Sequence, residues 1–187
     1  MKHALSNTLG SFGVFDIDTR TLKRQLNVAF FHGLESGINE EKKAFLEKKF
    51  ANVYYPKLDY FNDKEVFSKM LNEIKERKIS WLIGSSMGGW MAYALSTHTG
   101  NPCILFNPAL AMEGNAISHN VQVPSFTGNQ PANKYILLGK NDDVVDYRTT
   151  EEYLKKNNKG AYHITYGEHK HRTSYDLFAK MIDDVFG

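Results

Sequence analysis

The sequence predicts an α/β fold in which a mostly parallel central sheet carries helices on both faces. Short apolar runs typical of buried strands alternate with segments whose apolar residues recur at helical spacing. Polar or glycine-containing loops follow several of these runs, as at the ends of parallel strands. With 187 residues, the chain is long enough for one domain with a sizeable core. We therefore expect residues 1–187 to form a single domain.

The composition is that of a globular protein. Hydrophobic residues make up 42% of the chain and charged residues 24%, which excludes a disordered or fibrous protein. A net charge of +2 gives no reason to expect a nucleic-acid partner. The sequence has no signal-peptide core and no apolar run of about 18 residues. We expect a cytoplasmic protein with no membrane partner, and the sequence carries no signal for an oligomeric state.

Short apolar runs indicate the expected strands, and apolar residues at helical spacing indicate the expected helices. We expect residues 1–26 to form an N-terminal extension with an edge strand at 12–18. Asn62 and Glu65 are expected to cap the helix that follows them. The expected helices lie at 39–50, after Asn62 up to about Ile74, at 87–97 and near the C-terminus. The expected strands of the main sheet lie at 27–31, 53–55, 79–83, 103–106, 135–139 and 161–166.

Residues 109–133 interrupt this alternation. The segment contains several glycines, prolines and asparagines and is longer than a typical connection. It is too short for a helical lid domain. We expect an open, shallow site that Val121, Val123 and Phe126 partly line.

A nucleophile is expected at Ser86, where the strand at 79–83 turns sharply into a helix. Gly84 and Gly88 flank Ser86 in a Gly-x-Ser-x-Gly frame. A serine at such an elbow has a strained backbone, and its flanking residues must be small so that strand and helix can approach each other. Ser85 does not fit, because its flanking positions hold Ile83 and Met87.

Two backbone N–H groups are expected to form an oxyanion hole beside Ser86. The first belongs to Met87, directly after the serine at the start of a helix. The second belongs to Leu34, in the glycine-containing loop after the first buried strand. Gly33 and Trp90, which lie next to these two elements in the sequence, are expected to contact the substrate.

An acidic residue that orients a base is expected after the strand at 135–139. Asp142, Asp143 and Asp146 all follow this strand. Aspartates also favour turns for purely structural reasons. We prefer Asp142, keep Asp143 as its competitor and rank Asp146 third.

The base is expected after the last strand, where His169 and His171 compete. A serine needs a histidine to remove its proton and a carboxylate to orient that histidine. The chain order serine, aspartate, histidine is that of α/β-hydrolases. A His-x-His pair can also bind a metal, but the sequence offers no third or fourth ligand, so no metal is expected. Structural or exposed positions are the simpler interpretation of the remaining histidines, His3, His32, His98, His119 and His163.

Four motifs together are more specific than the serine frame alone. They are His32-Gly33-Leu34, Gly84-Ser85-Ser86-Met87-Gly88-Gly89-Trp90, Phe106-Asn107-Pro108-Ala109 and Asp142-Asp143-Val144-Val145-Asp146-Tyr147. With these motifs the chain resembles the small lidless bacterial esterases of the YqiA/YcfP type in the α/β-hydrolase superfamily. The resemblance covers most of the chain from Val28 onward.

The resemblance implies hydrolysis of short-chain esters and acyl thioesters without a metal or an organic cofactor. By it, Ser86 is the nucleophile, Asp142 orients the base and His169 is the base. The chain departs from the family in its first 26 residues and at His171, where the family tends to have an aromatic residue. We expect a serine carboxylesterase, with an acyl thioesterase or a non-catalytic binding protein on the same fold as the alternatives.

Overall fold

The protein is described by a computed structural model over residues 25–34, 36–111, 121–122, 131–158 and 160–187. The edge strand expected at 12–18 lies outside these described residues, as do Val123 and Phe126.

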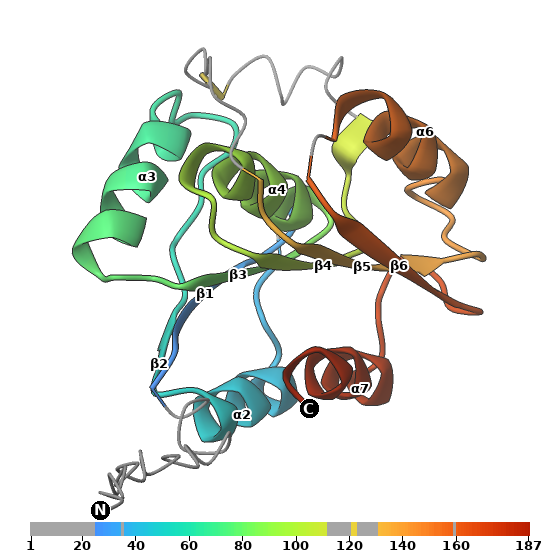
Figure 1. The fold of residues 1–187 in the computed structure, drawn as a ribbon, viewed down its shortest axis with the longest axis horizontal. Helices are drawn as coiled ribbons and strands as arrows, with labels where there is room; N and C mark the ends of the chain where they lie inside the picture. Colours follow the sequence, from blue (N-terminus) through green and yellow to red (C-terminus); the bar gives the residue numbers. More distant parts are fainter. Residues whose placement is uncertain (1–24, 35, 112–120, 123–130, 159) are drawn as a thin grey trace, which may run out of the picture.

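A six-stranded parallel sheet forms the centre of the molecule (Figure 1). The strands follow the order β2-β1-β3-β4-β5-β6, so the chain reverses its direction of travel across the sheet after β2. Loops at the carboxyl ends of β1 and β3 therefore meet at the switch point where α/β folds bind ligands. The strands are β1 (Asn27–Phe31), β2 (Asn52–Tyr54), β3 (Trp81–Ser85), β4 (Cys103–Phe106), β5 (Lys134–Gly139) and β6 (Tyr162–Gly167).

Helices cover both faces of the sheet, which confirms the predicted fold class. Figure 1 shows α3 (Val66–Glu76), α4 (Met87–Thr99) and α6 (Tyr147–Asn157) on one face. The opposite face carries α2 (Glu40–Lys49) and α7 (Tyr175–Phe186). Among the helices of the described ranges, none has both the length and the apolar character needed to cross a membrane.

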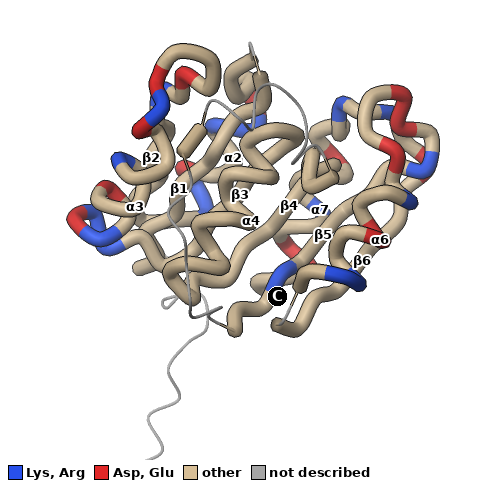
Figure 2. Tube along the Cα trace, turned by 90° about the horizontal axis from the view of Figure 1, so that it is seen from above, with Lys and Arg blue, Asp and Glu red and all other residues tan. Residues whose placement is uncertain are grey.

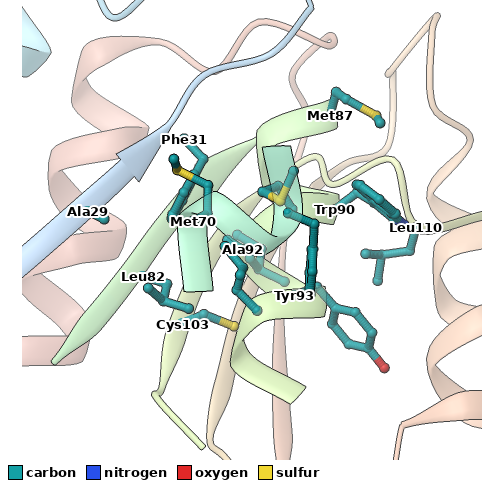
Figure 3. Packing of buried hydrophobic residues seen from close by; sticks show 14 of the residues in the cluster. Ala29, Phe31, Met70, Leu82, Met87, Trp90, Ala92, Tyr93, Cys103 and Leu110 are labelled. Atoms are coloured by element: carbon teal, nitrogen blue, oxygen red, sulfur yellow. The ribbon is translucent and has the colours of Figure 1, made fainter. Parts of the chain in front are cut away.

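The core is divided by the sheet into two layers. Ala29 and Phe31 of β1 pack into the layer beneath α3 and α4 (Figure 3), whereas Val28 and Phe30 pack into the layer beneath α2 and α7. Both faces of β1 are buried because helices cover the sheet on both sides. Its sequence is therefore continuously apolar rather than alternating.

Two features of the elements differ from the expectations. Helix α6 was not predicted, because only Thr150 and Leu154 of its 11 residues are buried and its apolar stripe is narrow. The expected cap by Asn62 and Glu65 is wrong: Asn62 instead donates to the carboxylate of Asp59, and α3 begins at Val66 without a side-chain cap. The carboxylate of Asp59 also accepts from the backbone N–H of Asn62, which keeps this segment in a turn.

Candidate active site

Ser86 occupies a strained turn between β3 and α4, as its sequence frame predicts. Its φ of 54° and ψ of −121° lie in a region that L-residues rarely adopt. The backbone is fixed on both sides of the serine. Its N–H donates to the carbonyl of Phe106 at 2.9 Å, and its own carbonyl accepts from the N–H of Ala109 at 3.0 Å.

The glycines around Ser86 are required by close backbone contacts. A Cβ atom on Gly84 would lie 2.2 Å from the carbonyl oxygen of Gly88. One on Gly88 would lie 2.0 Å from the carbonyl oxygen of Phe31, at the end of β1. One on Gly89 would lie 2.7 Å from Cβ of Pro108. Strand β3, helix α4 and the segment after β4 can therefore meet at the serine only if these positions carry no side chain.

Ser86, His171 and Asp142 form a continuous hydrogen-bonded chain. His171 Nε2 lies 2.9 Å from Ser86 Oγ. On the other side of the ring, Nδ1 lies 2.9 Å from Asp142 Oδ2 and 3.1 Å from Oδ1. The side chains of His171 and Asp142 are 19% and 1% exposed. This arrangement can remove the serine proton as the hydroxyl attacks an electrophile.

The loop after β5 holds the Asp142 carboxylate in place. Its Oδ1 accepts from the backbone N–H groups of Val144 and Val145, at 2.9 Å each. The side chain of Asp143 is 61% exposed and lies 3.9 Å from Lys170. Asp146 caps the N-terminus of α6 by accepting from the N–H of Arg148. Of the three aspartates, the structure therefore brings Asp142 alone into contact with the histidine.

The structure does not bring His169 to Ser86, contrary to the sequence-based expectation. Nε2 of His169 lies 3.3 Å from Nδ2 of Asn107, and its ring rests against the ends of β5 and β6. A Cβ on Gly167 would lie 2.5 Å from His169 Nδ1. Burial lowers the pKa of His169, with a smaller opposing influence from Asp142. His169 therefore favours a neutral ring packed under the loop.

The strand order gives the physical reason for this correction. Strand β6 lies three strands from β3, a distance of about 14 Å at the spacing of a sheet. His169 comes only two residues after β6 ends, whereas His171 has two further residues with which to cross toward Ser86. No local pattern distinguishes the two histidines. The order of the strands distinguishes them, and this order cannot be predicted from the sequence of the loop.

The loop after β1 lies against Ser86. A Cβ on Gly33 would be 3.2 Å from Cβ of Ser86. Leu34 is partly buried and packs against the core layer beneath α4. Met87 is the first residue of α4, where backbone N–H groups have no partner within the helix. His32 makes a different contact, with Nδ1 2.7 Å from the carbonyl oxygen of Gly33.

Two expected lining residues belong instead to the core. Trp90 is 5% exposed and lies in the same cluster as Leu110 (Figure 3), so the expectation that it contacts substrate is not supported. Trp90 lies one helical turn after Ser86, in a part of α4 where every residue from Met87 to Tyr93 is buried. Val121 is also buried in this cluster rather than lining an open site.

Two exposed lysines near the candidate site each lie beside a carboxylate. Lys140 lies 3.1 Å from Glu168, and Lys170 lies 3.9 Å from Asp143. Figure 2 shows basic and acidic positions interspersed along α3 and α6. Within the described ranges, no group of three or more His, Cys, Asp or Glu residues is arranged to hold a metal ion.

Sequence and structure comparisons relate the chain to known proteins. Residues 27–118, about half of the chain, match the model of the family described as "Uncharacterised protein family (UPF0227)", which is the YqiA/YcfP-type family and confirms the resemblance seen in the motifs. No curated protein shows significant sequence similarity to the chain.

Several solved structures share the fold at low sequence identity. A predicted CIB-like hydrolase from Thermoplasma acidophilum is 16% identical, with a TM-score of 0.59 over 87% of this chain and 85% of the other. The esterase EaEST from Exiguobacterium antarcticum is 14% identical, with a TM-score of 0.60 over 88% and 92%. The RedJ thioesterase from Streptomyces coelicolor is 10% identical, with a TM-score of 0.61 over 85% of each chain.

Proposed function

The chain has the α/β-hydrolase fold and matches the UPF0227 family over residues 27–118, and from this premise we propose that it is a serine carboxylesterase acting on short-chain acyl esters. The observation that carries the proposal is the single imidazole of His171, which bridges Ser86 Oγ and the Asp142 carboxylate. Fold alone does not imply activity, so the argument depends on these three side chains.

In the proposed acylation step, Ser86 Oγ attacks the ester carbonyl carbon while His171 Nε2 takes the hydroxyl proton. Asp142 orients the ring through Nδ1 and stabilises the imidazolium that forms. The carbonyl oxygen becomes an oxyanion, which the N–H groups of Met87 and Leu34 would stabilise by about 3 kcal/mol per donor. Collapse of this intermediate breaks the bond to the alcohol oxygen, and His171 returns its proton to the departing alcohol.

In the proposed deacylation step, water takes the place of the alcohol. His171 removes a proton from the water as its oxygen attacks the acyl carbon. The second tetrahedral intermediate then breaks its bond to Ser86 Oγ, which regains a proton from His171. The products are a carboxylic acid and the free enzyme, and no metal or organic cofactor is needed.

An acyl thioesterase with the same three residues is the alternative within this chemistry. A thioester that carries a nucleotide would require a cationic surface near the site. The exposed Lys140 and Lys170 each lie beside a carboxylate instead. For these two lysines, the charge pairing favours an uncharged ester as the substrate.

Covalent labelling tests the enzyme hypothesis directly. A serine-reactive phosphonate should modify wild-type protein at Ser86 and leave Ser86→Ala unmodified, with the labelled peptide identified by mass spectrometry. Lack of labelling at Ser86 would support a non-catalytic binding protein. Esters and acyl thioesters of graded chain length, assayed beside Ser86→Ala, then separate the two hydrolase alternatives.

A further inference from the structure

Asn107 directly follows β4. This strand lies between β3, which leads to Ser86, and β5, which precedes Asp142 (Figure 1). Asn107 is 1% exposed and has a φ of 44°, in the left-handed region. Asparagine tolerates this conformation better than most residues do. Its buried amide must find hydrogen-bond partners on both sides, since an unpaired buried polar group is costly.

The oxygen of the Asn107 side chain holds the end of β5. Oδ1 accepts from the N–H of Gly139 at 2.8 Å. The carbonyl of Gly139 in turn accepts from the N–H of Asp142 at 3.2 Å. One side chain therefore fixes the residue from which the Asp142 turn begins.

The nitrogen of the same side chain holds the histidine loop. Nδ2 donates to the carbonyl of His171 at 2.7 Å and to that of Lys170 at 3.2 Å, and it lies 3.3 Å from Nε2 of His169. An amide nitrogen has two hydrogens, so it can satisfy two of these acceptors at a time. The shortest of the three contacts is to the backbone of His171 itself.

We propose that Asn107 is a positioning residue, which sets the Asp142 turn and the backbone of His171 relative to Ser86 through the two halves of one buried amide. This inference rests on the proposed function. Asn107 does not touch the reacting atoms in this role. It acts through His171, whose Nε2 must stay within hydrogen-bond distance of Ser86 Oγ for proton transfer.

Asn107→Asp is the variant that separates the two halves of the amide. The aspartate keeps an oxygen that can accept from Gly139, but it replaces the donor to His171 with a second oxygen. That oxygen would face the carbonyls of Lys170 and His171, so the loop must move away.

Asn101→Asp provides a matched control. Nδ2 of Asn101 also donates to a backbone carbonyl, that of Ile79 at 2.8 Å. Asn101 precedes β4 and therefore lies at the opposite, amino edge of the sheet. Asn101→Asp therefore also removes an amide donor to a backbone carbonyl, but at a position outside the candidate site.

For Asn107→Asp, we expect kcat on a short-chain ester to fall about 100-fold, the typical cost of displacing a reacting group by 1 Å, with KM changed by less than about threefold. The rate of phosphonate labelling should fall in parallel. Asn101→Asp should keep kcat within about threefold of wild type.

A double-variant comparison distinguishes positioning from general damage. If Asn107 acts through His171, Asn107→Asp should cause no further loss in a His171→Ala background. An equal loss in both backgrounds would overturn the proposal, as would an active Asn107→Asp.

Asn107→Gly tolerates the positive φ and serves as a second variant if the aspartate does not fold. Failure of both to fold, with Asn101→Asp folded, would assign Asn107 a purely structural role. Wild-type protein unlabelled at Ser86 would refute the proposed function instead.

Discussion

Replacing His171 or His169 with alanine is the sharpest test of the proposed mechanism, because the two residues compete in the sequence but not in the structure. His171 lies 2.9 Å from Ser86 Oγ and contacts both oxygens of Asp142. His169 contacts the amide of Asn107 instead. The first substitution removes the proposed proton acceptor of the serine, whereas the second removes a ring packed under the loop.

The expected magnitudes differ by orders of magnitude. Without His171 the serine hydroxyl has no base and the buried Asp142 carboxylate, 1% exposed, loses its imidazole partner. We expect kcat to fall about 10⁴-fold, which corresponds to about 5 kcal/mol of transition-state stabilisation. For His169→Ala we expect a loss of less than about tenfold, since no proton transfer depends on it.

Initial rates with a short-chain chromogenic ester measure both effects, and Ser86→Ala sets the background rate. Thermal unfolding of each variant checks that the comparison concerns folded protein. An active His171→Ala beside an inactive, folded His169→Ala would refute the reasoning and return the base to His169. Equal and small losses in both variants would refute histidine-assisted serine catalysis at this site.

Three further predictions concern the acid, the elbow and a buried cation. Asp142→Asn should lower kcat about 10⁴-fold in the ester assay because the ring loses its orienting carboxylate, whereas the exposed Asp143→Asn should retain wild-type activity. Gly88→Ala places a Cβ 2.0 Å from a backbone oxygen of β1 and should lower the free energy of unfolding, measured in urea, by about 3 kcal/mol. Gly37→Ala is the control, because its Cβ meets nothing within 4 Å. An equal loss of stability in Gly37→Ala would contradict the prediction. Burial lowers the pKa of Lys134 in the folded protein. Between this lowered pKa and the ordinary value near 10.4, the folded protein therefore binds fewer protons than the unfolded chain. The stability of wild type consequently rises with pH across this interval. Lys134→Met should therefore be more stable than wild type by about 1 kcal/mol at pH 7, and a gain that persists unchanged above pH of about 10.5 would contradict the ionisation argument.

The fold could be predicted from the sequence because its signals are local. Strands such as β1 and β4 are buried on both faces, and a short continuous apolar run is enough to indicate them. Helix α6 escaped prediction because it buries only Thr150 and Leu154. Its start is nevertheless marked by Asp146, whose side chain caps the helix.

Some residues of the candidate site could likewise be predicted from the local sequence, and others could not. The elbow around Ser86 follows from sterics within a few residues, so the Gly-x-Ser-x-Gly frame was sufficient to locate it. The histidine depends on how far the loop after β6 must travel to reach β3, which is set by the strand order. The environment of Trp90 depends on the tertiary packing that buries all of α4 from Met87 to Tyr93, which the sequence next to Ser86 does not show.

The spacing of the sheet explains why the chain of hydrogen bonds needs β4 to end as it does. Ser86 and Asp142 follow β3 and β5, whose axes lie two strand spacings apart, or about 10 Å. The imidazole of His171 fills the gap between their side chains with a hydrogen bond of 2.9 Å on each side. Strand β4 ends beneath this gap and must leave it open for the ring. The positive φ of Asn107 turns the chain at that point, and its buried amide joins the two loops that carry Asp142 and His171. Strand β4, which carries none of the three proposed reacting groups, therefore ends in the residue that supports the loops after β5 and β6.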